Sequence, residues 1–253
     1  MFEINIISVT PENVAEHGLW CIKDRKAAGY QEKLAWFNTQ FEKGLRIKIA
    51  ENDGGVKIGF IEYTPAEQAW RPVDAPGYFF IHCMWVYPNN NRSQGVATQL
   101  IEHCEQDARQ SKKNGVCSFS SNGPWMKSKK IFLKLGYSEA AKLGRFELMV
   151  KKLATKAKDP AIIDWRQQQN NYDGWHLLYA HQCPWHEKSV QAMQSTAKAH
   201  GIKLNITRLN TPQDAQRAPS GFGVFSLLKD GKLLEDHYLS KTRFESIIKK
   251  ELN

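Results

Sequence analysis

No run of about 18 apolar residues occurs in the 253-residue sequence, so no transmembrane helix is predicted. The stretch from Met1 to Ile7 lacks the basic start and the long apolar core of a signal peptide. The five cysteines are odd in number and have no spacing typical of a metal site. We therefore expect no bound metal, mostly reduced thiols and a cytoplasmic protein.

Long basic tracts are also absent, because the net charge of +9 is spread over both halves of the chain. A solvated basic surface explains this charge better than nucleic-acid binding does, and we expect neither nucleic acid nor a membrane as a partner. The mild positive field would still attract a polyanionic ligand. A hydrophobic content of 42% is enough for one large domain or two ordinary packed domains.

Two different patterns of helices and strands divide the chain. Residues 1–153 predict the order β-α-α-β-β-β-α-β-α-β-β. Its first helix begins at Thr10–Pro11 and is expected to run to about Ala28, where Gly29 breaks it. Residues 154–174 are polar and weakly patterned, which indicates a linker with at most a short helical turn. Residues 175–253 predict a second, smaller domain in the order β-α-β-α-β-β-α.

The segment Arg92-Ser-Gln-Gly-Val-Ala97 is the most informative in the chain. It follows an apolar strand-like run, residues 78–87, and opens a strongly helical segment, residues 96–113. A loop at a helix N-terminus offers unpaired backbone N–H groups and the positive end of the helix dipole. Gly95 and Ala97 keep side chains out of the way, so the segment predicts a cradle for a bulky anion such as a pyrophosphate.

Two motifs in this half resemble those of a known family. Val86-Tyr-Pro88 followed by Arg92-x-x-Gly95-x-Ala97 is similar to the acetyl-CoA signature of the GNAT acetyltransferases, and Ile131–Tyr137 is similar to that family's Leu-Tyr-x-Lys-x-Gly-Phe helix end. The resemblance covers about the first 150 residues. It implies an α/β (α+β) fold with a mixed central sheet flanked by helices, and acetyl-CoA as cosubstrate.

The same resemblance implies where acetyl-CoA would lie. A strand edge near Trp85 and Val86 would hold the pantetheine arm and the thioester carbonyl, and Asn122 is the nearest candidate for a pantetheine-contacting asparagine. Arg92 would pair with a phosphate, although one extra residue between Pro88 and Arg92 departs from the family pattern. The pyrophosphate would meet backbone amides of Gln94, Gly95, Val96, Ala97 and Thr98.

His82 is the candidate general base. Strict alternation along the strand would place Phe80, His82, Met84 and Val86 on one face and the residues between them on the other. In the arylalkylamine branch of the family, a histidine at the matching place relays the amine proton, usually through water, and imidazole has a suitable pKa. A hydrogen-bonded core histidine is the alternative.

The general acid is missing from its usual place. The family commonly uses the tyrosine of its helix motif, and Phe132 stands there. Ser128, one turn earlier, or the nearby Tyr137 could replace it, or the thiolate could leave unassisted, because a thiol of pKa about 8.5 is a tolerable leaving group. A CoA-binding module without catalysis also remains open.

The second domain resembles the thioredoxin fold, and Gly221–Lys232 resembles the YoaP-like extension of some GNAT proteins. Cys183 precedes a helix that starts at Pro184, a position that lowers a thiol pKa, and a protonated His186 would add to this effect. His186 replaces the second redox cysteine, so dithiol exchange is not expected. Cys183 could act as a catalytic monothiol, or the corner could be an inherited structural feature.

Together these patterns predict an acetyl-CoA-dependent N-acetyltransferase in which an amine attacks the thioester directly. A small-molecule amine is the preferred acceptor. A peptide or protein amine, a CoA-binding regulatory module and a thiol-redox protein led by Cys183 are the alternatives. The oligomeric state is open, with a homodimer as one option.

Overall fold

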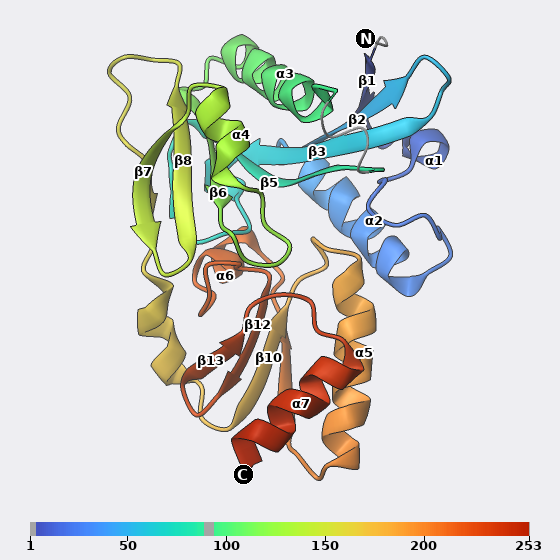
Figure 1. Cartoon of the computed structure of the whole chain (residues 1–253), viewed down its shortest axis with the longest axis vertical. Helices are drawn as coiled ribbons and strands as arrows, with labels where there is room; N and C mark the ends of the chain where they lie inside the picture. Colours follow the sequence, from blue (N-terminus) through green and yellow to red (C-terminus); the bar gives the residue numbers. More distant parts are fainter. Residues whose placement is uncertain (1–3, 89–93, 253) are drawn as a thin grey trace. The chain divides into compact units, whose positions relative to one another are not determined.

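The computed structural model describes residues 4–88 and 94–252 (Figure 1). They form two compact units, each made of separate stretches of chain. Unit 1 contains the residues up to Lys23, then Phe37–Ala69 and Val73–Ile162. Unit 2 contains Asp24–Trp36, Trp70–Pro72 and the residues from Ile163 onward. The domain borders expected at residues 153 and 174 stay a prediction.

Unit 1 is built on a mixed sheet, as the sequence predicts. In the described part of the chain it has seven strands in the order β1-β2-β3-β5-β6-β8-β7 (Figure 1). Only β5 and β6 pair in parallel, and all other neighbours are antiparallel. The strands are β1 (Ile4–Val9), β2 (Arg46–Asn52), β3 (Lys57–Pro65), β5 (Tyr78–Val86), β6 (Gly115–Ser120), β7 (Ser138–Leu143) and β8 (Phe146–Lys152).

Two helices of unit 1 position the site. Helix α3 (Val96–Gln110) buries its apolar side, including Leu100, Ile101 and Cys104, against the sheet. Helix α4 (Lys129–Lys134) follows β6 and contributes the buried Phe132 to the same core. The smaller elements are α1 (Val14–His17), the 3-10 turn η1 (Ala66–Gln68) and the paired strands β4 (Val73–Asp74) and β9 (Ala161–Ile162).

The long first helix that the sequence predicts does not form. Helix α1 spans only four residues, and α2 (Ala28–Phe41) begins at Ala28 and continues through Gly29. Gly29 therefore lies inside a helix instead of ending one. Its missing side chain has a packing role, because a Cβ built there would lie 2.0 Å from the carbonyl oxygen of Pro184.

A β-bulge in β5 overturns the strict alternation expected along that strand. Glu62 pairs with Cys83, but the next residue of β3, Tyr63, pairs with Ile81, so His82 is the extra residue. Beyond the bulge the faces exchange. Met84 and Val86 consequently pack in the same core, under α3, as Ile81, and Trp85 takes the opposite face.

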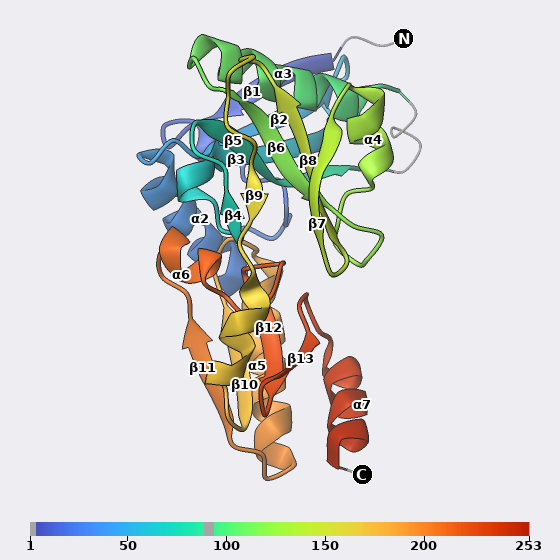
Figure 2. The same cartoon turned by 90° about the vertical axis from the view of Figure 1, so that its left-hand side faces the viewer.

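Unit 2 follows the order β-α-β-α-β-β-α predicted from the sequence (Figure 2). Its described strands form a four-stranded sheet in the order β11-β10-β12-β13, in which only β10 and β11 are parallel. The 3-10 turn η3 (Trp165–Asn171) precedes this sheet. The other elements are β10 (Trp175–Tyr179), α5 (Trp185–Ala199), β11 (Leu204–Arg208), α6 (Pro212–Gln216), β12 (Phe225–Lys229), β13 (Lys232–Glu235) and α7 (Lys241–Leu252).

Within the described residues, no helix combines the length and the apolar character that crossing a membrane requires.

Candidate active site

Helix α3 begins at an open glycine. Gly95 has φ +81° and ψ 0°, the left-handed conformation that glycine adopts without strain, and its carbonyl accepts the first helical hydrogen bond from Gln99 at 3.0 Å. A Cβ at Gly95 would meet nothing within 4 Å among the described atoms. The first turn carries no acidic residue. The described residues therefore leave space at Gly95, and the first turn itself places no negative charge there that would repel an anion.

Side chains around this turn are consistent with a polar ligand. Val96 is buried and anchors the helix, whereas Ala97 and Thr98 are half-buried. The side-chain oxygen of Gln94 is buried and accepts no hydrogen bond from any described residue. An orphaned buried acceptor is rare in a folded protein and fits a site that a ligand or water completes. Arg92 lies outside the described residues.

Strands β5 and β6 diverge after Phe80. Their pairing covers Tyr78–Phe80 and Gly115–Cys117, and no further pair forms between the described residues of the two strands. From Ser118 onward, β6 pairs with β8 but no longer with β5 among the described residues. A Cβ at Gly59 of β3 would lie 3.1 Å from both the Trp85 oxygen and Val96, so the start of α3 lies close to the Val86 end of β5.

Polar groups from β6 and the following loop occupy the point of divergence. Ser118 Oγ donates to the Ile81 carbonyl at 2.9 Å. Lys127 Nζ donates to the carbonyls of Ile81 (3.3 Å) and His82 (3.0 Å). The sequence does not predict this role of Lys127, because no local pattern indicates that a lysine in a loop will bind the carbonyls of a distant strand. Farther along β5, Val86 is buried and Trp85 is 42% exposed, with its ring 5.6 Å from that of Trp20.

His82 forms a fully buried pair with a carboxylate. Its Nδ1 lies 3.3 Å from Glu62 Oε1, and neither side chain has exposed surface. The ring of Phe80 lies 5.6 Å away. Burial of a carboxylate and an imidazole side by side requires this pairing, because either group alone would lose its hydration. The base assignment stays a prediction, and it now requires a water or an amine to reach His82 from the diverging edge.

The contacts of the general-acid candidates indicate structural roles for most of these residues. Ser128 is exposed and caps α4, where its side chain accepts from the Lys130 amide at 3.4 Å. Phe132 is fully buried, with its ring 5.2 Å from that of Tyr137. Burial raises the pKa of the Tyr137 phenol far above its usual value, with the neighbouring Cys104 as the next cause. Tyr137 is thus held neutral inside the core.

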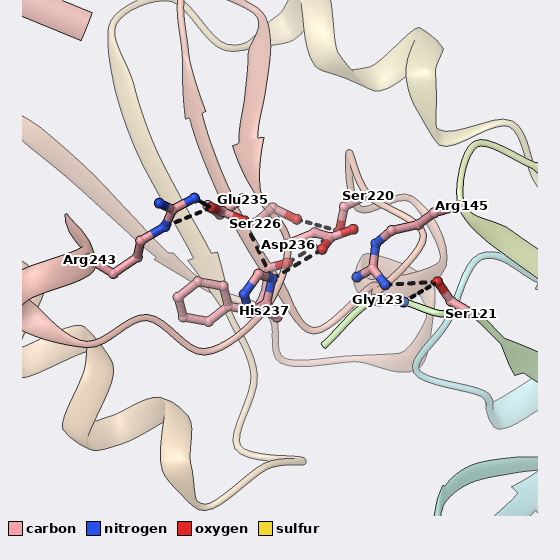
Figure 3. Close-up of polar contacts among 10 residues, drawn as sticks. Ser121, Gly123, Arg145, Ser220, Ser226, Glu235, Asp236, His237 and Arg243 are labelled. Carbon is pink, nitrogen blue, oxygen red and sulfur yellow. Dashed lines mark hydrogen bonds and ion pairs between the residues drawn. The ribbon is translucent and has the colours of Figure 1, made fainter. Parts of the chain in front are cut away.

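Asn122 lies exposed in the loop between β6 and α4. Ser121, the preceding residue, fixes this loop: its hydroxyl accepts from Arg145 Nη1 and from the Gly123 amide, both at 3.1 Å (Figure 3). Asn122 therefore has a defined position after the diverging strand, and its contact with pantetheine stays a prediction.

The Cys183 corner of unit 2 is the second candidate site. Cys183 is half-buried and its carbonyl accepts from the His186 amide at 3.2 Å, at the start of α5. The His186 side chain is buried, with Nδ1 2.9 Å from the Ala180 carbonyl oxygen. Burial lowers the pKa of His186 to about 3. The expectation that a protonated His186 assists Cys183 is therefore wrong, because a buried imidazole without a counter-charge stays neutral.

Segments of the chain's own N-terminal half pack on this corner within unit 2. Gly29 of α2 lies directly against Pro184. His181 lies between two carboxylates, Glu32 at 2.9 Å and Glu187 at 3.7 Å. The loop before β12 is packed in the same way, since a Cβ at Gly223 would lie 2.7 Å from the Trp70 carbonyl oxygen.

Hydrogen bonds inside unit 2 hold the loop before β12 from its other side. Ser226 of β12 donates to the Ser220 hydroxyl at 2.8 Å (Figure 3). Nearby, Arg243 of α7 donates to Glu235 of β13 at 2.8 and 3.2 Å. No group of three or more His, Cys, Asp or Glu residues in the described part of the chain is arranged to hold a metal ion.

Comparison with known proteins identifies the class. Residues 12–137 match the acetyltransferase (GNAT) family, and residues 203–246 match a YoaP-like family. Residues 12–137 thus belong to the GNAT acetyltransferase family, and the protein is an N-acetyltransferase by class, which confirms the resemblance seen in the sequence. It is 26% identical to the uncharacterized N-acetyltransferase YoaP of Bacillus subtilis (strain 168), over 96% of this chain and 97% of that protein.

Solved structures resemble the chain less closely. An N-acetyltransferase from Staphylococcus aureus Mu50 is 18% identical, with a TM-score of 0.43, over 61% of this chain and 99% of that chain. A GNAT family acetyltransferase from Brucella melitensis in complex with acetyl-CoA is 16% identical, with a TM-score of 0.40, over 64% and 96%. Mutant forms of the spermidine/spermine N-acetyltransferase SpeG from Vibrio cholerae are 13% identical, with a TM-score of 0.42, over 59% and 95%. No substrate or site residue follows from similarity this low.

Proposed function

We propose that unit 1 transfers the acetyl group of acetyl-CoA to the amine of a small molecule. One observation carries this proposal: the open, left-handed Gly95 starts α3 close to the Val86 end of β5, and among the described residues β6 no longer pairs with β5 after Phe80. The helix start offers amides to a pyrophosphate, and the edge of β5 from which β6 diverges would line an extended amide-containing arm. Coenzyme A carries both groups.

Each part of the cosubstrate has named partners in this proposal. Arg92 pairs with a phosphate, Trp85 and Val86 of β5 line the pantetheine arm, and Asn122 contacts it from the loop after β6. The buried oxygen of Gln94 supports the assignment, because it needs a donor that the described protein residues do not supply. The pyrophosphate is bound by amides of Gln94, Gly95, Val96, Ala97 and Thr98.

His82 takes the proton of the attacking amine through water. Glu62 is its positioning residue, since a carboxylate 3.3 Å from Nδ1 fixes the ring and favours the imidazolium that forms. The amine nitrogen bonds to the thioester carbon, the carbon–sulfur bond breaks, and the sulfur leaves with the electron pair. No acyl-enzyme forms.

Unit 2 is inferred to be thioredoxin-like, an assignment that its element order and its single parallel strand pair support. The covered corner favours a structural role for Cys183. None of the five cysteines forms a disulfide, which supports the proposed cytoplasmic location.

Calorimetry with CoA and acetyl-CoA tests the proposal first, followed by CoA release across a panel of aromatic amines, polyamines and peptide N-termini. We expect binding of both nucleotides and turnover with a small amine. Binding without turnover on any acceptor would favour the regulatory module, and turnover only with peptides would favour the peptide N-acetyltransferase. Absence of binding heat from both nucleotides would overturn the proposal.

A further inference from the structure

Departure of the CoA thiolate leaves a negative charge that Phe132 cannot neutralise. Phe132 has no polar atom and is fully buried, and Tyr137 is held neutral in the core beside it. Ser128 is exposed and engaged as the helix cap of α4. If acetyl transfer takes place on this sheet, as proposed above, another group must meet the leaving sulfur.

Lys127 is a cation fixed at the point where β5 and β6 part. Ile81 and His82, whose carbonyls accept its Nζ at 3.3 and 3.0 Å, are the first β5 residues beyond the last β5–β6 pair. Its own carbonyl accepts from the Ser121 amide at 3.1 Å, which ties the loop to the end of β6. The half-buried lysine is thus held both at its backbone and at its ammonium group. An ammonium has three hydrogen-bond donors, and the two carbonyls of β5 use two of them.

The direction of the cosubstrate arm leads toward this cation. The start of α3 lies at the Val86 end of β5, because Gly59 approaches both the Trp85 oxygen and Val96. From Val86 back to His82 the strand spans four residues, about 13 Å at 3.3 Å per residue. An arm that leaves the cradle and follows the edge of β5 from which β6 diverges therefore carries its sulfur end toward Lys127.

We propose that the Lys127 ammonium stabilises the thiolate of CoA as it leaves, a role that rests on the proposed acetyl transfer. The amine proton goes to His82, the carbon–sulfur electron pair stays on sulfur, and the sulfur anion lies beside Nζ. A lysine ammonium is a weaker acid than a thiol by about two pKa units, so Lys127 keeps its proton and acts through its charge. The thiolate takes a proton from solvent when CoA is released.

Other charged groups near the diverging strands act on the same anion. Glu62 of β3 carries a carboxylate that opposes it, and an imidazolium on His82 of β5 favours it. Arg145 is a further cation, and it donates a hydrogen bond to Ser121, a residue of the loop that precedes Lys127. Because these groups are common to all variants compared below, a difference between the variants reports Lys127 itself.

The titration of bound CoA tests the role directly. The ultraviolet absorbance of the thiolate is followed against pH in the CoA complex, and the same titration with desulfo-CoA removes the signal of the protein's own cysteines. The wild-type complex is compared with Lys127→Met, Lys127→Arg and the control Lys129→Met. Lys129 lies two residues further along the chain, as the first residue of α4, and its ammonium pairs with Glu147 at 2.7 Å.

We expect the bound thiol to titrate below free CoA in the wild type, in Lys127→Arg and in Lys129→Met. Lys127→Met should raise its pKa by at least about one unit, a tenfold loss of thiolate at a given pH, and lower kcat about 100-fold, as loss of one transition-state donor does. CoA affinity should change by less than about threefold, because the pyrophosphate contacts are intact. A purely structural lysine would not shift the thiol titration.

Two results would overturn the proposal. The first is an equal pKa of the bound CoA thiol in the wild type and in Lys127→Met. The second is a bound thiol in the wild type that titrates at or above free CoA, a measurement that decides the question even if Lys127→Met does not fold. Failure of the wild type to bind CoA at all would instead reject the proposed function, so the two failures are distinguishable.

Discussion

Two strand-to-helix corners in this chain carry the same local signal for binding an anion or activating a thiol. One leads from β5 to α3 in unit 1, and the other leads from β10 to α5 in unit 2. At the first, a Cβ added to Gly95 would meet nothing within 4 Å among the described atoms. At the second, the Pro184 carbonyl lies so close to α2 that Gly29 has no room for a Cβ.

The charged residues near the two helix starts also favour an anion at the first corner over the second. The first turn of α3 has no acidic residue, whereas α5 carries Glu187 in its first turn and Glu32 lies 2.9 Å from the adjacent His181. A helix N-terminus therefore gives only the potential for a site. Whether the potential is used depends on what other segments of the chain place over it.

The most severe change to the first corner is Gly95→Glu. The substitution puts a carboxylate where a diphosphate is proposed to bind and forces a non-glycine residue to φ +81°. Like-charge contact costs several kcal/mol, so CoA affinity should fall by more than about 100-fold, measured by calorimetry. Gly201→Glu, at φ +68° and also in open space, is the matched control in unit 2. Unchanged affinity in Gly95→Glu would show that the cradle is not used.

His82→Gln tests whether the open corner serves catalysis as well as binding. The rate of CoA release should fall about 100-fold, the lower range for a general base, and most strongly at low pH, where the amine is protonated and needs help. CoA affinity should be unchanged, because His82 lies away from the helix start. An unaltered pH–rate profile would instead leave His82 as a core histidine paired with Glu62.

Local sequence predicted the element order of unit 2, the start of α3 and, apart from the short strand β4, the element order of residues 1–153. It could not predict the bulge at His82, since the register shift depends on how β3 pairs and alternation alone assumes none. It also missed Lys127, which reaches Ile81 from a segment 46 residues away in the chain. The prediction that Gly29 ends a helix is wrong for the same reason. Gly29 packs against Pro184, which lies in the other half of the sequence.

The covered corner should make unit 2 sensitive to acid. His186 has a pKa of about 3 in the folded chain, below the ordinary value of 6.5. Between these values the unfolded chain binds a proton that the folded chain does not. Stability should therefore decrease as pH falls below 6.5, by up to about 1.4 kcal/mol per pH unit. Denaturant unfolding from pH 8 to 4.5 should show this slope, and His186→Asn should reduce it. Equal slopes in both proteins would contradict the neutral assignment.

Gly29→Ala tests the packing that covers the second corner. The new methyl group has to displace the Pro184 carbonyl, and overpacking of this kind costs about 1–3 kcal/mol. The gain in helix propensity offsets at most about 1 kcal/mol. Gly54→Ala is the control, because its Cβ would meet only Asn52 Oδ1, at 3.5 Å. Thermal unfolding compares the two, and equal melting temperatures would show that α2 does not pack on the corner.

Cys183→Ser should have the smallest effect, and it decides between the two corners. Cys183 is half-buried, its helix start is covered by Gly29, and His186 adds no positive charge, so no feature of the corner requires its thiol for acetyl transfer. A change this minor is worth about 0.5 kcal/mol, and CoA release should stay within about twofold of the wild type. The thiol-redox alternative makes the opposite claim, that Cys183→Ser is inactive while Gly95→Glu retains activity. Measuring both variants under the same conditions therefore assigns the chemistry to one corner, because each alternative requires one of the two proteins to fail.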